Sequence, residues 1–299
     1  PDMRSTSVSR RRAPWTAGTG LLRERRTPAA GAGLVSPVGE RARRLRGSRD
    51  RRPVLEGGRA ESLRVGCTAL AMRLDAPPAP GARRGVTVGF RISAPRANAR
   101  FGTSGGQARF GNAIPILASH RGGRPDLDPY IALGDPFFSR TSRWSARLRV
   151  PHGWHIATTG HRTGDRRTRS GRHLTVLAPR ARDFAIVAGR FRTIAATVGG
   201  VRVRHLSAPG APRPRARRML STATRSLAAF GHRYGPYRAR ELEVVETPGL
   251  ESGGMEYPGL VLSEASAETV VHEVAHLWWS SQLGSDGWRA PWLDETLTT

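Results

Sequence analysis

The 299-residue sequence predicts an α+β fold, in which an antiparallel β-sheet domain is followed by a smaller domain that begins with a helix. Short runs of alternating apolar and polar residues fill positions 61–207, and such alternation indicates half-buried strands. Apolar residues then recur at helical spacing from Arg215 to His232. The charge also changes, because residues 241–299 hold eleven acidic residues and one arginine in a chain of net charge +26. We therefore place a domain boundary near residue 208.

The composition excludes several classes of protein. Only 38% of the residues are apolar and 6% aromatic, and the 35 glycines and 22 prolines exclude a coiled coil, a collagen and an all-helical bundle. No run approaches the roughly 20 apolar residues of a membrane-spanning helix, so we expect no transmembrane segment. The single cysteine, Cys67, cannot form an internal disulfide. No signal peptide is visible, and the sequence leaves cytoplasmic and secreted locations open.

Residues 1–60 form an arginine-rich lead that we expect to be disordered. They contain fifteen arginines against five acidic residues, and charge blocks such as Arg41–Arg52 repel themselves. All 49 basic residues of the chain are arginine, which indicates a compositional bias more than selection for phosphate binding. Nonspecific nucleic-acid binding through counterion release is kept as an alternative function. No zinc-finger spacing or RNA-binding signature predicts a specific nucleic-acid partner.

The β-rich region 61–207 consists of strand-like runs separated by turn residues. The clearest runs are Leu63–Leu70, Gly85–Ile92, Ser145–Val150 and Phe184–Phe191. Their arginines fall mainly on the polar side of the alternation, so we expect those arginines on a solvated outer face.

The region after residue 208 mixes helices and strands. The predicted helix Arg215–His232 is followed by two strand-like runs, Leu242–Val245 and Leu260–Leu262. A longer apolar helix starts at about Ser266, whose hydroxyl suits an N-cap. A last helix-like run covers Trp292–Leu297.

The strongest chemical signal is the His272-Glu273-Val-Ala-His276 motif in this apolar helix. Residues four apart lie one turn apart on the same face, where two neutral imidazoles can share one Zn²⁺ at about 2.0–2.1 Å. Glu273 lies about 100° round the helix, from where it can deprotonate a water bound to the metal. Imidazoles and a carboxylate in a buried helix are unfavourable unless a metal satisfies them. We therefore predict one zinc ion.

A catalytic zinc site needs a third protein ligand and leaves the fourth position for water. The acidic residues after His276 are Asp286, Asp294 and Glu295. Asp286 lies in the turn-like segment 284–287, which favours a turn carboxylate. Glu295 lies in the helix-like run, eighteen residues beyond His276. We predict that Glu295 is the third ligand.

These motifs resemble the zinc aminopeptidases of the membrane alanyl aminopeptidase family. That family places its third ligand in Trp-Leu-Asn-Glu, and this chain has Trp-Leu-Asp-Glu with Asp294 as the departure. The family motif Gly-X-Met-Glu-Asn is matched from Gly253 to Glu256, with Tyr257 in place of asparagine. The tract Pro129–Ser139 also resembles the β-domain that precedes the catalytic domain in this family.

The resemblance covers residues 61–299 and implies a domain organisation and an activity. Residues 61–207 would form the β-rich N-terminal aminopeptidase domain. Residues 208–299 would form the start of a thermolysin-like zinc-peptidase catalytic domain. The implied activity is zinc-dependent hydrolysis of the first peptide bond of a peptide with a free N-terminus.

The resemblance also implies roles for individual residues. They are the zinc ligands His272, His276 and Glu295, the catalytic residue Glu273, and the substrate-binding residues Gly253, Gly254, Met255 and Glu256. Glu256 would bind the α-ammonium of the substrate, which is mostly charged at neutral pH. The two glycines would let the backbone approach the substrate closely.

Two further interpretations of the zinc motif stay open. A thermolysin-like endopeptidase shares the helix motif and the downstream glutamate, and a non-catalytic scaffold could carry a vestigial zinc site. Members of the resembled family use a tyrosine well beyond the third ligand, and a helical domain, to complete the site. The sequence ends four residues after Glu295. We therefore expect weak zinc binding and little or no turnover from this chain alone.

Overall fold

The computed structural model describes residues 92–128, 135 and 138–299 throughout. Before residue 92 it describes residues 79, 82 and 85 and the strands β1 (Gly20–Leu22), β2 (Ala32–Val35), β3 (Val54–Leu55), β4 (Gly58–Leu63), β5 (Ala69–Leu74) and β6 (Val86–Val88). The rest of the lead 1–60 lies outside the described residues. So do the middle of the predicted run Leu63–Leu70 and most of the tract Pro129–Ser139.

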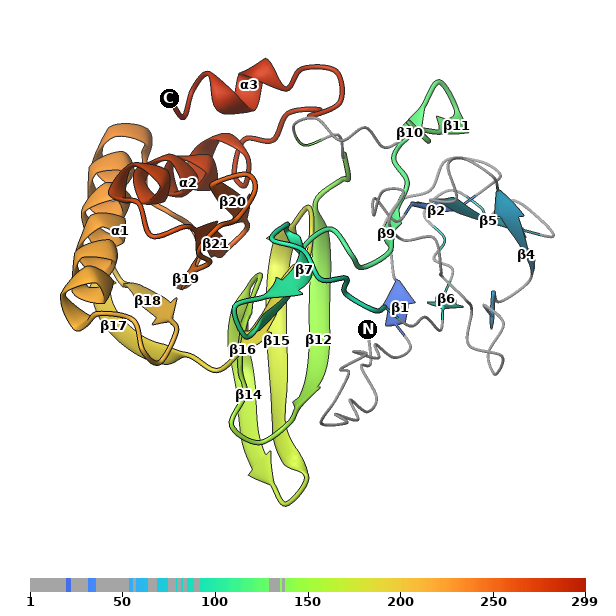
Figure 1. Ribbon diagram of the computed structural model, residues 1–299. Coiled ribbons are helices and arrows are strands. Elements are labelled where there is room, and N and C mark those ends of the chain that lie inside the picture. The colour runs from blue at the N-terminus through green and yellow to red at the C-terminus, as the bar shows by residue number, and fades with distance from the viewer. Residues whose placement is uncertain are drawn as a thin grey trace.

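The fold is α+β, as predicted, and most strand pairs are antiparallel (Figure 1). The β-rich part continues with β7 (Phe101–Ser104), β8 (Gln107–Phe110), β9 (Ile116–Leu117), β10 (His120–Arg121), β11 (Arg124–Pro125), β12 (Ser142–Val150), β13 (His155–Thr158), β14 (His161–Thr168), β15 (Gly171–Ala181) and β16 (Ile186–Gly189). The described strands up to this point form sheets with the orders β1-β6-β3, β4-β5-β2-β9, β10-β11, β12-β15-β14 and β13-β16-β8-β7.

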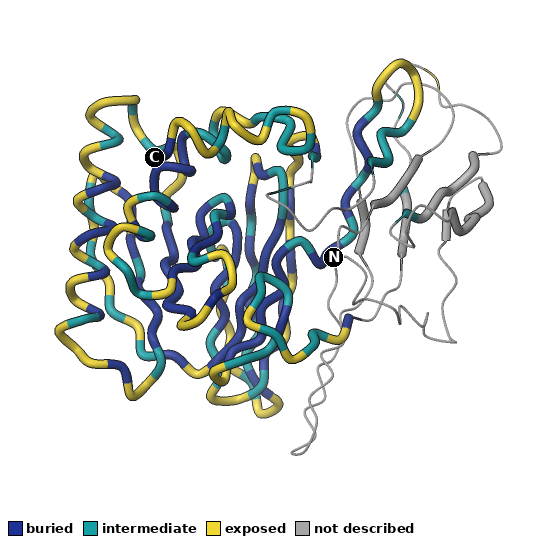
Figure 2. The backbone as a smooth tube through the Cα atoms, turned by 45° about the horizontal axis from the view of Figure 1, so that its top comes forward, coloured by how far each residue is buried: buried dark blue, intermediate teal, exposed yellow. Residues whose placement is uncertain are grey.

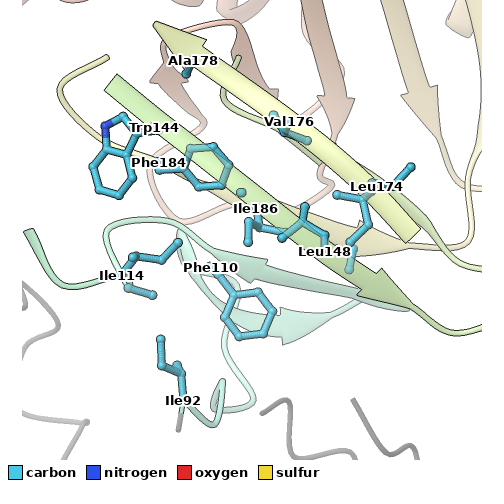
Figure 3. Close-up of a cluster of buried hydrophobic side chains, with 14 of the residues drawn as sticks. Ile92, Phe110, Ile114, Trp144, Leu148, Leu174, Val176, Ala178, Phe184 and Ile186 are labelled. Carbon is cyan, nitrogen blue, oxygen red and sulfur yellow. The ribbon is translucent and has the colours of Figure 1, made fainter. Parts of the chain in front are cut away.

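The sheets β12-β15-β14 and β13-β16-β8-β7 pack face to face around an apolar core (Figure 3). Along β12 every second residue is buried, so Leu148 and Val150 point into this core while Arg147 and Arg149 are exposed. The predicted solvated arginine face is confirmed for this strand. Burial of this kind stabilises a sheet because apolar area is removed from water at about 25 cal/mol per Å².

The predicted alternation is wrong for the run Phe184–Phe191. Every residue of β16 is buried, and so is every residue of β8 beside it. The two faces of β16 pack against different layers: Ile186 lies in the sandwich core and Val187 in a second core on the opposite side. A strand in a middle layer needs apolar residues on both faces, as the sequence Phe-Ala-Ile-Val-Ala provides.

The second part of the chain forms a five-stranded sheet covered by helices on one face (Figure 1). Its strands are β17 (Arg192–Val198), β18 (Val201–Ser207), β19 (Glu241–Glu246), β20 (Gly254–Tyr257) and β21 (Leu260–Ser263), in the order β17-β18-β19-β21-β20. The pairs β18-β19 and β19-β21 are parallel. The predicted domain division at residues 207 and 208 stays a prediction, and this sheet continues across it through β17 and β18.

Helices α1 (Arg213–Tyr234) and α2 (Ala267–Trp279) pack on one face of this sheet through a shared apolar cluster. The other face packs on β13 and β16. Buried residues are concentrated in the strands between the layers and on the sheet-facing sides of the two helices, and the outer turns are exposed (Figure 2). A four-residue helix, α3 (Trp292–Glu295), follows. Among the described residues, no helix has the length and apolar character needed to cross a membrane.

The sequence of α2 explains where this helix begins and why it is buried. Ser266 is its N-cap, and the Ser266 hydroxyl accepts a hydrogen bond from the Thr269 N–H at 3.4 Å, as predicted. Glu268 lies in the first turn, where the helix dipole favours a negative charge. Val270, Val274 and Leu277 are fully buried against the sheet. The helix thus holds its polar residues in a fixed position above β20 and β21.

Candidate metal centre

Helix α2 brings His272 and His276 together on one face. Their Nε2 atoms are 3.1 Å apart, and the ring planes are nearly perpendicular at 88°. His276 is 0% exposed, whereas the side chain of His272 is 33% exposed. The pair therefore lies at the edge of the core, with one imidazole reachable from outside.

Helix α3 places Glu295 beside this pair. The Oε2 atom of Glu295 is 3.3 Å from Nε2 of His272 and 3.7 Å from Nε2 of His276. A tetrahedral zinc site with bonds of about 2.0 Å has ligand atoms separated by about 3.3 Å. The three observed separations match that edge length, and the three side chains form one of the described groups able to hold a metal ion.

Asp294 orients one of the imidazoles. Its Oδ1 is 2.7 Å from Nδ1 of His276, so this nitrogen donates its hydrogen to the carboxylate. The lone pair of His276 is then left on Nε2, on the side of His272 and Glu295. Metal-binding histidines usually have such a partner, which fixes the tautomer and raises the basicity of the ligand. The aspartate that departs from the family motif is thus the residue that holds His276.

Glu273 lies on the side of α2 that faces β20. Its side chain is 4% exposed, and its Oε2 atom has no hydrogen-bond partner among the described residues. Burial, followed by the nearby negative charge of Glu295, raises the pKa of Glu273 well above its usual value. A buried carboxylate with a free oxygen next to a candidate metal-binding cluster has the arrangement of a general base.

The structure shows a further reason why residue 254 is a glycine, beside its predicted approach to the substrate. A Cβ atom at Gly254 would lie 1.9 Å from Oε1 of Glu273, so the missing side chain makes room for that carboxylate. Gly253 has a φ of +74°, a left-handed conformation that favours glycine, and its N–H donates to the Leu250 carbonyl in a turn. Both glycines therefore shape the strand that faces Glu273.

Glu256 and Met255 follow on the same strand and point to different sides. Met255 is 4% exposed in the core beneath the sheet. Glu256 lies on the side of α2 and, with Glu273 and His276, forms a second described group with metal-ligand spacing. Loss of solvation, followed by the charge of Asp135, raises the pKa of Glu256 well above its usual value. Glu256 thus lies close to other carboxylates, and a bound cation relieves the repulsion among them.

A cavity adjoins this cluster. Its wall includes Glu256, Met255 and Asp294, together with residues of the β-rich part such as Asp135 and Arg182. Asp135 forms an ion pair with Arg100. Tyr257, which stands where the family has asparagine, donates a hydrogen bond from its hydroxyl to Oδ1 of Asn112 at 3.0 Å. These contacts come from segments far away in the sequence, and the motifs carried no signal for them.

The segment that precedes α3 is held by ion pairs to the β-rich part. Arg289 Nη2 is 3.1 Å from Asp126 and 2.7 Å from Asp128, and Arg289 Nη1 is 2.9 Å from Asp286. Arg121 Nη2 also lies 2.8 Å from Asp286. Asp286 is a turn residue, as predicted, because its carbonyl accepts the N–H groups of residues 289 and 290. Its ion pairs were not predicted.

Comparison with known proteins gives one partial similarity. Over 130 residues the chain is 33% identical to Aminopeptidase M1-B of rice, Oryza sativa subsp. japonica. This match covers 37% of the chain and 15% of the rice protein. No family model matches the chain. The chain therefore has a distant, partial homologue among the aminopeptidases, and this similarity points to a peptidase.

Proposed function

We propose that this chain carries the metal site of a zinc-dependent aminopeptidase, which removes the first residue of peptides with a free N-terminus. The observation that supports this most directly is the convergence of His272, His276 and Glu295 at separations suited to zinc. The partial similarity to an aminopeptidase agrees with it. A zinc ion bound there would supply Lewis-acid polarisation of the substrate carbonyl and lower the pKa of water.

The residues of the chain have distinct tasks in this proposal. Glu256 binds the ammonium group of the substrate and so fixes the distance from the chain end to the scissile bond. Oε2 of Glu273 accepts a proton from water while the water oxygen bonds to the carbonyl carbon. Glu273 then gives this proton to the leaving nitrogen as the carbon–nitrogen bond breaks. Asp294 keeps the hydrogen of His276 on Nδ1.

Metal analysis of a variant at the proposed general base and of a variant at a proposed metal ligand tests this proposal. In equilibrium zinc titrations the wild-type chain and Glu273→Gln are expected to bind one zinc ion each, whereas His276→Ala binds none. In the full-length protein, we expect a peptide with a free amine to be cleaved and its N-acetyl form to stay intact, whereas the 299-residue chain alone shows little or no turnover. General-base catalysis is worth about 10²- to 10⁴-fold, so Glu273→Gln is expected to lose at least a hundredfold in rate.

Three results would contradict the proposal in different ways. A wild-type chain that binds no zinc removes its basis. Loss of zinc in Glu273→Gln would show that Glu273 is structural and favour the scaffold interpretation. Cleavage of internal bonds in N-acetyl peptides would favour a thermolysin-like endopeptidase.

A further inference from the structure

The cavity beside Glu256 also contains an arginine. Arg182 directly follows β15 and lines the same cavity as Glu256 and Asp294. Arg182 is thus a cationic residue in the wall of the cavity that also contains the carboxylate to which we assign the substrate ammonium. A peptide bound there would meet a positive and a negative protein group in the wall of one cavity.

The guanidinium of Arg182 has few partners in the protein. Its Nη1 donates to the carbonyl of Ser139 at 3.1 Å, and its Cζ lies 5.6 Å from the centroid of the Phe138 ring. Its Nε is buried and has no hydrogen-bond partner among the described residues. No carboxylate in the described part of the chain comes within ion-pair distance of it. The carbonyl and the ring that contact the guanidinium carry no negative charge.

The guanidinium of Arg182 packs against the loop that follows α2. A Cβ atom at Gly284 would lie 2.0 Å from Cζ, Nε and Nη2 of Arg182, so the backbone of that loop packs directly against the charged group. Arg182 is therefore held by the loop that follows α2 and by the β-rich part together. A guanidinium held in this way loses little further freedom when it binds a ligand.

Apart from Glu256, the other charged groups of the cavity wall already have partners. The contacts are Arg100 with Asp135, Asp294 with His276, and Asp183 with Asn112 and the Phe184 N–H. Burial lowers the pKa of Arg182, and the charge of Asp294 opposes this effect. A partly buried cation without a paired anion is unfavourable, and a bound anion relieves it.

We propose that Arg182 binds a carboxylate of the substrate while Glu256 binds its ammonium. The hydroxyl of Ser281, which is buried, unpartnered among the described residues and part of the same wall, supplies a second donor. This inference rests on the proposed aminopeptidase function and names its substrate class. The preferred substrates are short peptides that carry a carboxylate close to the free amine.

Two sources supply such a carboxylate. One is the side chain of an aspartate or glutamate at the first position of a peptide. The other is the terminal carboxylate of a dipeptide. Both offer the planar pair of oxygens that a guanidinium binds with two parallel hydrogen bonds, and both remain charged at neutral pH.

Equilibrium binding of four dipeptides to the zinc-free chain tests this inference. The probes are Glu-Ala-amide with its isosteric control Gln-Ala-amide, and Ala-Ala with its control Ala-Ala-amide. The zinc is removed with a chelator that is then dialysed away, so that a carboxylate bound by zinc cannot imitate the effect. Ligand-observed NMR titration measures each dissociation constant without any turnover.

A charge-assisted hydrogen bond predicts a preference on the order of tenfold to a hundredfold for the carboxylate ligand. Preference within the first pair identifies the side-chain source, and preference within the second pair the terminal source. Arg182→Gln is expected to abolish the preference, and Arg182→Lys to keep part of it. Arg180→Gln, two residues earlier on β15 and exposed, is the matched control and keeps the full preference.

Equal affinities within both pairs in the wild type would overturn the inference, and this result requires no variant to fold. A preference that survives in a folded Arg182→Gln variant would also overturn it. Zinc stoichiometry and N-acetyl peptides test the proposed function separately. A chain that prefers carboxylates but binds no zinc and ignores the free amine contradicts the aminopeptidase proposal and supports an anion site at Arg182.

Discussion

The two helices that supply the candidate zinc ligands differ in how they are held. Helix α2 has seven buried residues among its thirteen, whereas none of the four residues of α3 is buried. His276 is fully enclosed, while the side chain of Glu295 is 59% exposed. Apolar packing therefore fixes two ligands and polar contacts fix the third. The candidate site thus has a rigid half, the two histidines of α2, and a charged half, Glu295 of α3, whose position depends on polar contacts.

The absence of buried residues in α3 predicts a large difference in hydrogen exchange between the helices. Without zinc, the amide of residue 296 is expected to exchange far faster than the amides of Val274 and Leu277, because its opening exposes no core. Zinc at a hundred times its dissociation constant is expected to slow exchange in α3 by up to about a hundredfold, since binding opposes the opening. Mass spectrometry with local resolution measures both. Equal protection of the two helices without zinc would refute this comparison.

The second prediction concerns the contact that joins the two helices. Asp294→Ala removes the acceptor of the His276 Nδ1–H, and loss of such an outer partner lowers metal affinity about 10- to 100-fold. Asp294→Asn keeps an acceptor oxygen without the charge and is expected to lose less. Competition with a fluorescent zinc chelator gives the affinities. If Asp294→Ala binds zinc as tightly as the wild type, then apolar packing alone positions both ligands.

The smallest effect is expected at Arg289, which lies before α3. Arg289→Ala removes the ion pairs to Asp126, Asp128 and Asp286 and is expected to weaken zinc binding severalfold at low salt. In 0.5 M salt, where the Debye length is only about 4 Å, the difference from the wild type should shrink. Arg233→Ala on the exposed surface of α1 is the control. A salt-independent loss would show that Arg289 acts through packing.

The sequence predicted the rigid half of the site better than the charged half. The motif His272-Glu-X-X-His276 and the N-cap Ser266 are local signals, because helical geometry fixes how residues four apart lie. Glu295 was reached by a different argument, from the need for a third ligand and from the family resemblance, and the structure brings it near the histidines. The role of this ligand set in zinc binding stays a prediction.

The missed contacts are those between distant segments. Arg289 and Asp126 are 163 residues apart, and nothing in their local sequence indicates a partner. The buried strand β16 was mistaken for a half-exposed one, because a short apolar run does not reveal how many layers cover it. The local sequence does not indicate that Gly254 contacts the side chain of Glu273, and its role beside the substrate stays a prediction. The local sequence pattern therefore predicts helices and strands well, but it predicts poorly which segments pack against them.

The close approach of Gly254 to Glu273 has a consequence for how this protein can vary. A side chain at position 254 would require the Glu273 carboxylate to move, so we expect substitutions at the two positions to be coupled. A shorter acid at 273 would open space at 254 but withdraw its oxygens from the metal side. The position of the Glu273 carboxylate therefore depends on a residue of β20 as well as on α2. Substitutions at positions 254 and 273 are expected to be correlated among homologous proteins.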